Sequence, residues 1–233
     1  MAVRADRAQD LARIHVEAIG GEERIAELKS LRASGHVTAG DKRVRFTMTA
    51  ARPNLIRLET EGGGRTLVQG SDGEEPAWEF DTGSWPPQYR AMAPATAKTF
   101  VADAEFDDPL VAAAARGYSL DFAGEMKIDG QSFLRVLVTG SRAATFSVII
   151  DPRTYFIVMR IEQRESAGGR KAQVVTHYED FRPVDGVLLP HQIAVAINGK
   201  VTQRTVIDRI DANPELAEDT FRRPRAAAKP GKS

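Results

Sequence analysis

The sequence predicts a mainly β (α+β) fold built on a single curved antiparallel sheet of about ten or eleven strands. Apolar and polar residues alternate with a period of two over much of the chain between residues 34 and 210. Hairpin dipeptides such as Asp129-Gly130 and Asp185-Gly186 separate these segments. The helical period is confined to two segments, so strands and helices do not alternate as they would around a parallel sheet.

The chain opens with an amphipathic helix, expected from about residue 6 to residue 19. Leu11, Ile14 and Ala18 recur at helical spacing among charged residues. Gly20-Gly21 then ends the helix, because glycine readily adopts the backbone conformation that follows a helix. A second short helical turn leads into the first strand.

Residues 34–80 read as a meander of four or five short strands. Val44, Phe46 and Met48 alternate with polar residues, as a half-buried strand requires. Glycine-rich turns follow at residues 61–64 and 70–73. Such short connections join antiparallel neighbours.

Residues 81–95 interrupt the strands with several prolines and a glycine. This loop also carries three large apolar side chains, expected to form either a mobile lid or an ordinary packed surface loop: Trp85, Tyr89 and Met92. Residues 96–117 are then expected to be helical, with an interruption near Pro109. This segment and the first helix are expected to cover the sheet.

The second half of the chain returns to strands joined by tight turns, and no linker separates it from the first half. We therefore expect one domain over residues 1–224. The remaining residues, 225–233, are rich in Ala, Pro and basic side chains and are expected to be a disordered basic tail.

Composition and motifs exclude several classes of function. Lys plus Arg and Asp plus Glu both number 32, so no overall charge attracts nucleic acid. Cysteine is absent, which excludes disulfides and thiolate nucleophiles. None of the four histidines has zinc-motif spacing, and His177 beside Glu179 suits the solvent face of a strand. No phosphate-binding glycine motif or nucleophile elbow occurs, so we expect no enzymatic activity, no metal and no cofactor.

The location of the protein is left open by composition. No apolar run approaches the ~20 residues of a membrane span. The first residues lack the apolar segment of a signal peptide. The protein is thus expected to be either cytoplasmic as encoded or a mature chain whose export signal is missing.

An alternating sheet of this size has one apolar face that its own side chains do not fill completely. Helices that cover such a face partially would leave a container for an apolar ligand. The residues expected to line this cavity are Val44, Phe46, Met48, Trp78, Phe80, Val136, Phe146, Val148 and Ile150.

Several phrases, taken in order, resemble one protein family. They are IHVEAIGGEERIAELKSLRASG at residues 14–35, Asp72-Gly73 ahead of Trp78, IDPRT at 150–154, YEDFRPVDGVLLP at 178–190, and IDANP at 210–214 with FRRP at 221–224. This order is similar to that of the outer-membrane lipoprotein-sorting proteins, the LolA-like superfamily of bacterial periplasmic carriers. The similarity extends over residues ~10 to 224.

The resemblance implies an unclosed antiparallel β-barrel with an N-terminal helix and a mid-chain helical plug. It implies a periplasmic protein that binds lipoprotein acyl chains or other lipids non-covalently, in exchange with a membrane-associated donor or acceptor protein. No lid-gating residue of these carriers matches a position in this chain. Two alternatives remain: a sensor or interaction domain of an envelope-stress system with the same fold, and a cytoplasmic START-like ligand binder. The strand and polar tail at the C-terminus count against the latter, since START-like folds end in a long helix.

Overall fold

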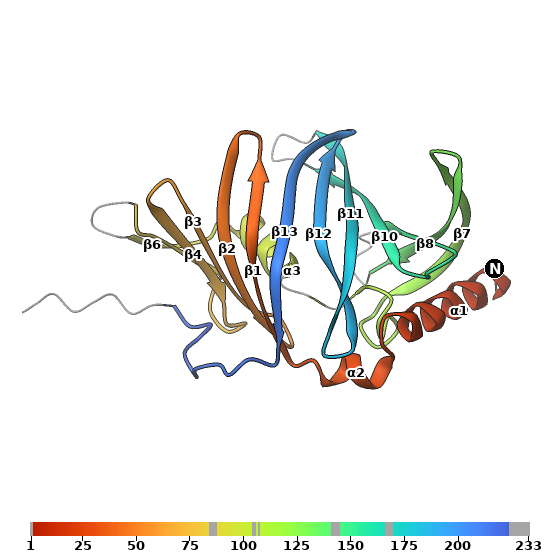
Figure 1. The fold of residues 1–233 in the computed structure, drawn as a ribbon, viewed down its shortest axis with the longest axis horizontal. Coiled ribbons are helices and arrows are strands. Elements are labelled where there is room, and N and C mark those ends of the chain that lie inside the picture. The colour runs from red at the N-terminus through yellow and green to blue at the C-terminus, as the bar shows by residue number, and fades with distance from the viewer. Residues whose placement is uncertain are drawn as a thin grey trace, which may run out of the picture. The chain divides into compact units, whose positions relative to one another are not determined.

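The computed structural model describes residues 2–83, 88–103, 106, 108–140, 145–165 and 170–223 (Figure 1). Its helices are α1 (Ala2–Ala18), α2 (Glu22–Glu27) and α3 (Pro94–Asp103). Its strands are β1 (Ser30–Ala39), β2 (Lys42–Ala51), β3 (Leu55–Gly62), β4 (Arg65–Ser71), β5 (Trp78–Asp81), β6 (Gln88–Ala91), β7 (Ser119–Ile128), β8 (Gln131–Thr139), β9 (Thr145–Ile150), β10 (Ile157–Glu165), β11 (Lys171–Val184), β12 (Val187–Ile197) and β13 (Lys200–Ala212). The predicted tail and Trp85 of the predicted lid lie outside the described residues.

The thirteen strands of the described residues form one antiparallel sheet in the order β6-β5-β4-β3-β2-β1-β13-β12-β11-β10-β9-β8-β7. The order is linear, with β6 at one end and β7 at the other, so the sheet is not closed into a barrel. This confirms the predicted mainly β, open antiparallel fold, with more strands than the ten or eleven expected. One of the additional strands is β6, which lies inside the segment predicted to be a loop. No helix in the described part of the chain is long and apolar enough to cross a bilayer.

Two compact units make up the chain. The larger unit contains Met1–Leu28, Gly35–Arg43 and Asp107–Ile210, and the smaller contains Lys29–Ser34, Val44–Phe106 and Asp211–Ser233. The expectation of a single domain over residues 1–224 stays a prediction.

In the larger unit, the predicted amphipathic helix is present as α1 and packs on one face of the sheet. Its Ala8, Leu11 and Ala12 join a buried cluster with apolar residues of β8 and β9. The helix ends where predicted. An added Cβ at Gly20 would lie 2.6 Å from the carbonyl oxygen of Gly186, so only glycine fits there.

The predicted helix over residues 96–117 is only partly correct. The helix α3 ends at Asp103, and residues 109–117 form turns. Here a side chain competes with helical hydrogen bonding, because the carboxylate of Asp108 accepts from the backbone N–H of Leu110 at 2.8 Å. The guanidinium of Arg116 donates to the carbonyl oxygens of Asp108 and Val111 at 2.7 and 3.0 Å. The Ala-rich composition predicted a helix, and these local bonds hold turns instead.

Candidate functional site

Cross-strand register identifies the residues that share a face in the larger unit, since directly opposed residues of antiparallel strands project to the same side. It joins Val136, Val148, Arg160, Thr176 and Val195 into one row across β8 to β12. The side of this row is named the α1-side face, because Val136 and Val148 belong to the cluster that contacts α1.

Under α1, this face is a closed apolar core. It brings together four of the residues predicted to line a cavity: Val136, Phe146, Val148 and Ile150. All four are buried, and α1 contributes the side chains that fill the space above them. Whether this cluster opens to take up a ligand stays a prediction.

A buried histidine fastens α1 over the cluster. His15 is 1% exposed, with Nδ1 2.7 Å from the carbonyl oxygen of Tyr155 and Nε2 3.0 Å from Oδ2 of Asp108. A carbonyl oxygen only accepts, so Nδ1 carries a proton. Nε2 must carry a second proton to donate to the carboxylate. Burial lowers the pKa of His15, but the charge and hydrogen bond of Asp108, with the bond to Tyr155, raise it above its ordinary value.

On β11 and β12, the same face stays partly open. Six residues, named the β11–β12 strip, lie here: Val174, Thr176, Tyr178, Ile193, Val195 and Ile197. All but Val174 are at least partly exposed, and Ile197 is 40% exposed. Sequence reasoning missed this strip, although the alternation of Ile193, Val195 and Ile197 was a usable signal. An apolar face that solvent reaches is a suitable surface for an apolar ligand.

Charged side chains of β10 separate the strip from the closed core. The guanidinium of Arg160 lies 4.1 Å from the ring centroid of Phe146, and its Nη2 donates to Oε2 of Glu162 at 2.9 Å. Oε1 of Glu162 accepts from Nε of Arg164 at 2.6 Å. Arg160, Glu162 and Arg164 are named the β10 charge cluster. An apolar face that carries two guanidinium groups suits a ligand with both an apolar and a polar part.

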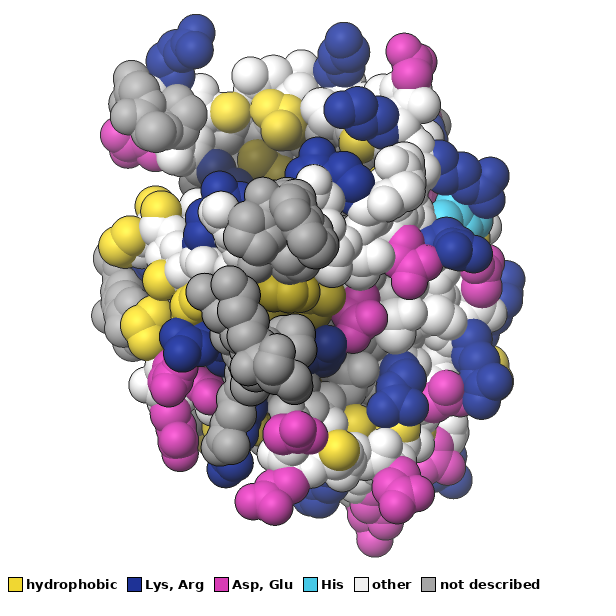
Figure 2. Space-filling model, turned by 90° about the vertical axis from the view of Figure 1, so that its left-hand side faces the viewer, with side chains coloured by type: hydrophobic (Ala, Val, Ile, Leu, Met, Phe, Trp, Pro, Cys, Tyr) yellow, Lys and Arg dark blue, Asp and Glu magenta, His cyan; other side chains and the backbone are white. Residues whose placement is uncertain are grey.

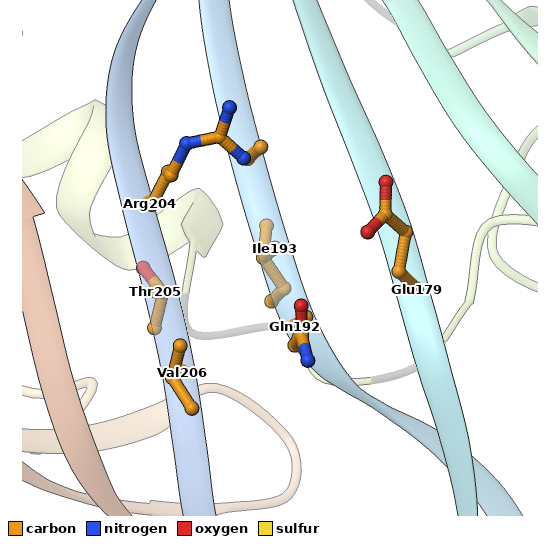
Figure 3. Close-up of a pocket in the computed structure, with 7 residues that line it drawn as sticks. Glu179, Gln192, Ile193, Arg204, Thr205 and Val206 are labelled. Carbon is orange, nitrogen blue, oxygen red and sulfur yellow. The ribbon is translucent and has the colours of Figure 1, made fainter.

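The opposite face carries both polar and apolar residues on β11 and β12, where Val175 and Ala196 lie beside His177 and Glu179. A depression of about 50 Å³ is lined there from β11, β12 and β13. Glu179, Gln192 and Arg204 contribute exposed polar side chains to it (Figure 3). His177 and Glu179 lie on this side, as predicted for a solvent face. No group of side chains that would hold a metal ion occurs among the described residues. The depression is too small for an acyl chain.

The five predicted site residues in the smaller unit fall on two faces of its strands. Phe46 is opposed by Thr60, and Met48 by Leu58, so Val44, Phe46 and Met48 share one face. Trp78 is opposed by Gly70, and Gly70 by Arg57, which places Trp78 on the other face. Phe80 lies two residues after Trp78 and shares that face. The structure thus does not bring these five residues together on one surface.

Two residues of the predicted lid are described in the smaller unit. Tyr89 is in β6, directly opposite Phe80, and Met92 is buried with its backbone N–H bonded to the carbonyl oxygen of Ala77 at 2.8 Å. Figure 2 shows hydrophobic side chains reaching the surface among basic and acidic ones on the side of the molecule that it presents. Whether this segment acts as a lid stays a prediction.

Solved structures resemble the chain over nearly its whole length. A domain from Vibrio parahaemolyticus, described as a candidate outer membrane lipoprotein-sorting protein, matches with a TM-score of 0.60 at 10% identity, over 94% of this chain and 97% of the other. A LolA superfamily protein from Nitrosomonas europaea matches with a TM-score of 0.56 at 15% identity, over 93% and 97%. The chain has the LolA-like fold. A protein of the DUF1329 family from Desulfovibrio piger also matches the chain, with a TM-score of 0.58 at 13% identity over 94% of this chain and 97% of the other.

At these identities, the likeness concerns the fold alone. No protein-family model matches the sequence, and no curated protein matches it. The LolA-like fold agrees with the family resemblance found in the order of sequence phrases.

Proposed function

We propose that this LolA-like protein is a periplasmic binder or carrier of acylated ligands that works by reversible burial, without covalent chemistry. The ligands are lipoprotein acyl chains or other lipids, exchanged with a membrane-associated donor or acceptor. The observation that carries the proposal is the α1-side face, where the partly exposed, mostly apolar β11–β12 strip lies beside the charged side chains of β10. The names of the lipoprotein-sorting neighbours support it by analogy of fold.

The energetics of burial favour such a ligand. Removing a methylene group from water contributes about 0.8 kcal/mol, so a chain that lies along the strip gains several kcal/mol before ordering costs. The residues of the smaller unit carry no weight in this proposal, because they lie on two faces.

A charge placed on the strip tests the proposal. Val195→Glu puts a carboxylate in the middle of the α1-side face, where contact with an acyl chain would remove water from the carboxylate. We expect it to weaken the binding of a fluorescent fatty acid by about tenfold or more, which corresponds to about 1.4 kcal/mol. Binding is measured by fluorescence titration of the purified protein.

Gln192→Glu is the matched control, because it adds the same charge to the same strand on the opposite, exposed face. It should leave the affinity within about twofold of wild type. Circular dichroism must show that both variants fold. Absence of probe binding by wild-type protein, together with no co-purified lipid, would refute the proposed function.

A further inference from the structure

The β10 charge cluster carries a net positive charge. Arg160 and Arg164 both pair with Glu162, and no other ion pair of either arginine exists among the described residues. The side chain of Glu162 is 13% exposed, whereas that of Arg160 is 35% exposed. One carboxylate thus neutralises only one of two guanidinium groups, and the surplus charge remains within reach of solvent.

Arg160 also has an unmet hydrogen-bonding capacity. Its Nε is buried and has no hydrogen-bond partner in the structure. A buried donor without an acceptor is unfavourable, because it has lost water and gained nothing in return. The side chain as a whole is partly exposed, so a shift of this side chain on ligand binding would bring the donor to an incoming oxygen.

The cluster borders the β11–β12 strip on one side and the closed core on the other. Thr176 of the β11–β12 strip lies directly opposite Arg160, and Val148 of the closed core lies opposite it on the other side. Neighbouring strands are about 4.8 Å apart, so an acyl chain on the strip has its end within reach of the guanidinium. The hydroxyl group of Thr176 provides a second polar contact at the same place.

We propose that the β10 charge cluster receives the anionic end, a carboxylate or a phosphate, of a ligand whose acyl chain lies on the β11–β12 strip. The inference rests on the proposed function and narrows its ligand class to anionic amphiphiles. Guanidinium groups bind both anions through paired, charge-assisted hydrogen bonds. An uncharged glyceride makes no such bonds and is a weaker ligand.

The test compares three single-chain amphiphiles of equal acyl length in competition with a fluorescent fatty acid. One carries a carboxylate, one is a lysophosphatidic acid with a terminal phosphate, and one is a neutral monoacylglycerol. We expect wild-type protein to bind the anionic ligands about tenfold more tightly than the neutral one. The two anionic arms show whether the carboxylate or the phosphate is preferred.

Two variants of the β10 charge cluster should change the preference for anionic over neutral ligands in opposite directions. Arg160→Met should weaken the binding of the anionic ligands about tenfold and leave the neutral ligand within about twofold. Glu162→Gln removes the competing carboxylate and should tighten anion binding about threefold. A gain in affinity cannot arise from misfolding, so Glu162→Gln still tests the inference if Arg160→Met is destabilised.

Arg135→Met is the matched control. Arg135 is a half-buried arginine on the opposite face of the same sheet, and its Nε donates to the hydroxyl oxygen of Ser147 at 2.9 Å. It should leave all three affinities within about twofold. Equal binding of neutral and anionic ligands by wild-type protein, or an equal loss in Arg135→Met, would overturn the head-group inference while leaving the proposed function intact. Failure of all three amphiphiles to bind would overturn both.

Discussion

The ring of Trp78 lies directly against Gly70 on the neighbouring strand of the smaller unit. A Cβ added to Gly70 would be 2.4 Å from Cζ2 of the ring and 2.7 Å from Cε2. Trp78 is fully buried, and the guanidinium of Arg57 lies 6.0 Å from its ring centroid on the same face. The glycine therefore provides the space in which the indole packs.

Gly70→Ala should destabilise the protein by about 1–3 kcal/mol, because the methyl group forces a buried ring out of its position. The free energy of unfolding in urea measures this cost. In a Trp78→Leu background, Gly70→Ala should cost much less, since leucine leaves room for the methyl group. An equal cost of Gly70→Ala in both backgrounds would contradict this account.

The sequence predicts which residues of one strand lie on the same side of the sheet, but not which residues of two different strands do. The alternation of Val44, Phe46 and Met48 correctly predicts that they share one side. Matching this side to that of Trp78 requires the cross-strand register, which turn lengths and bulges determine. A register shift between Phe122 and Glu125 shows how one bulge changes the correspondence. The alternation within each strand does not determine this register.

At the scale of the elements, the packing of α1 on the sheet depends on a titratable group. The imidazole of His15 bonds both to Asp108 and to the backbone at Tyr155, which lie far from α1 in the sequence. Both bonds require the protonated ring, and the pKa of His15 in the folded protein lies above its ordinary value. Folding therefore favours proton binding at this site.

The stability of the protein should fall as the pH rises from the unfolded pKa of His15, about 6.5, through its raised folded pKa. The contribution is fully present below the unfolded pKa and is lost above the folded pKa. The slope from this one group is at most about 1.4 kcal/mol per pH unit. Urea unfolding across this pH range measures it.

His15→Gln is the control, because glutamine keeps hydrogen-bonding groups but does not titrate near neutral pH. It should lower the free energy of unfolding at acidic pH and flatten this part of the profile. If the wild-type protein and His15→Gln show the same slope of stability against pH, the charge on His15 does not contribute to holding α1.

The strands and α1 were predictable as elements because burial on one side imposes a period on the residues. The turns at residues 109–117 were not. Their Ala-rich sequence is a good helix former, but bonds from Arg116 to the carbonyl oxygens of Asp108 and Val111 stabilise turns in its place. Such bonds depend on particular side chains at particular positions in the segment, which helix propensity summed over its composition does not include.

At the scale of the whole molecule, the LolA-like fold persists at 10–15% identity to its structural neighbours. The family resemblance rests on the order of helix stops and turns in the sequence, including Gly20-Gly21 and Asp185-Gly186. Gly20, Gly21 and Gly186 all adopt positive φ, where other residues are strained, so the backbone at these stops and turns has a physical requirement for glycine. The polar end of the proposed site was not predictable, because Arg160 shares its face with Phe146 only through the register of β9 and β10.

The length of the acyl chain tests how far the proposed site extends. Each added methylene group that is buried should lower the Kd about fourfold, from about 0.8 kcal/mol per group. This gain should stop once the chain exceeds the β11–β12 strip, because further methylene groups remain in water. Competition by fatty acids of ~8 to ~16 carbons measures the dependence. His15→Gln should show the same limit, because the β10 charge cluster lies between the strip and the core under α1. An affinity that does not change with chain length in either protein would contradict burial of the acyl chain on this face.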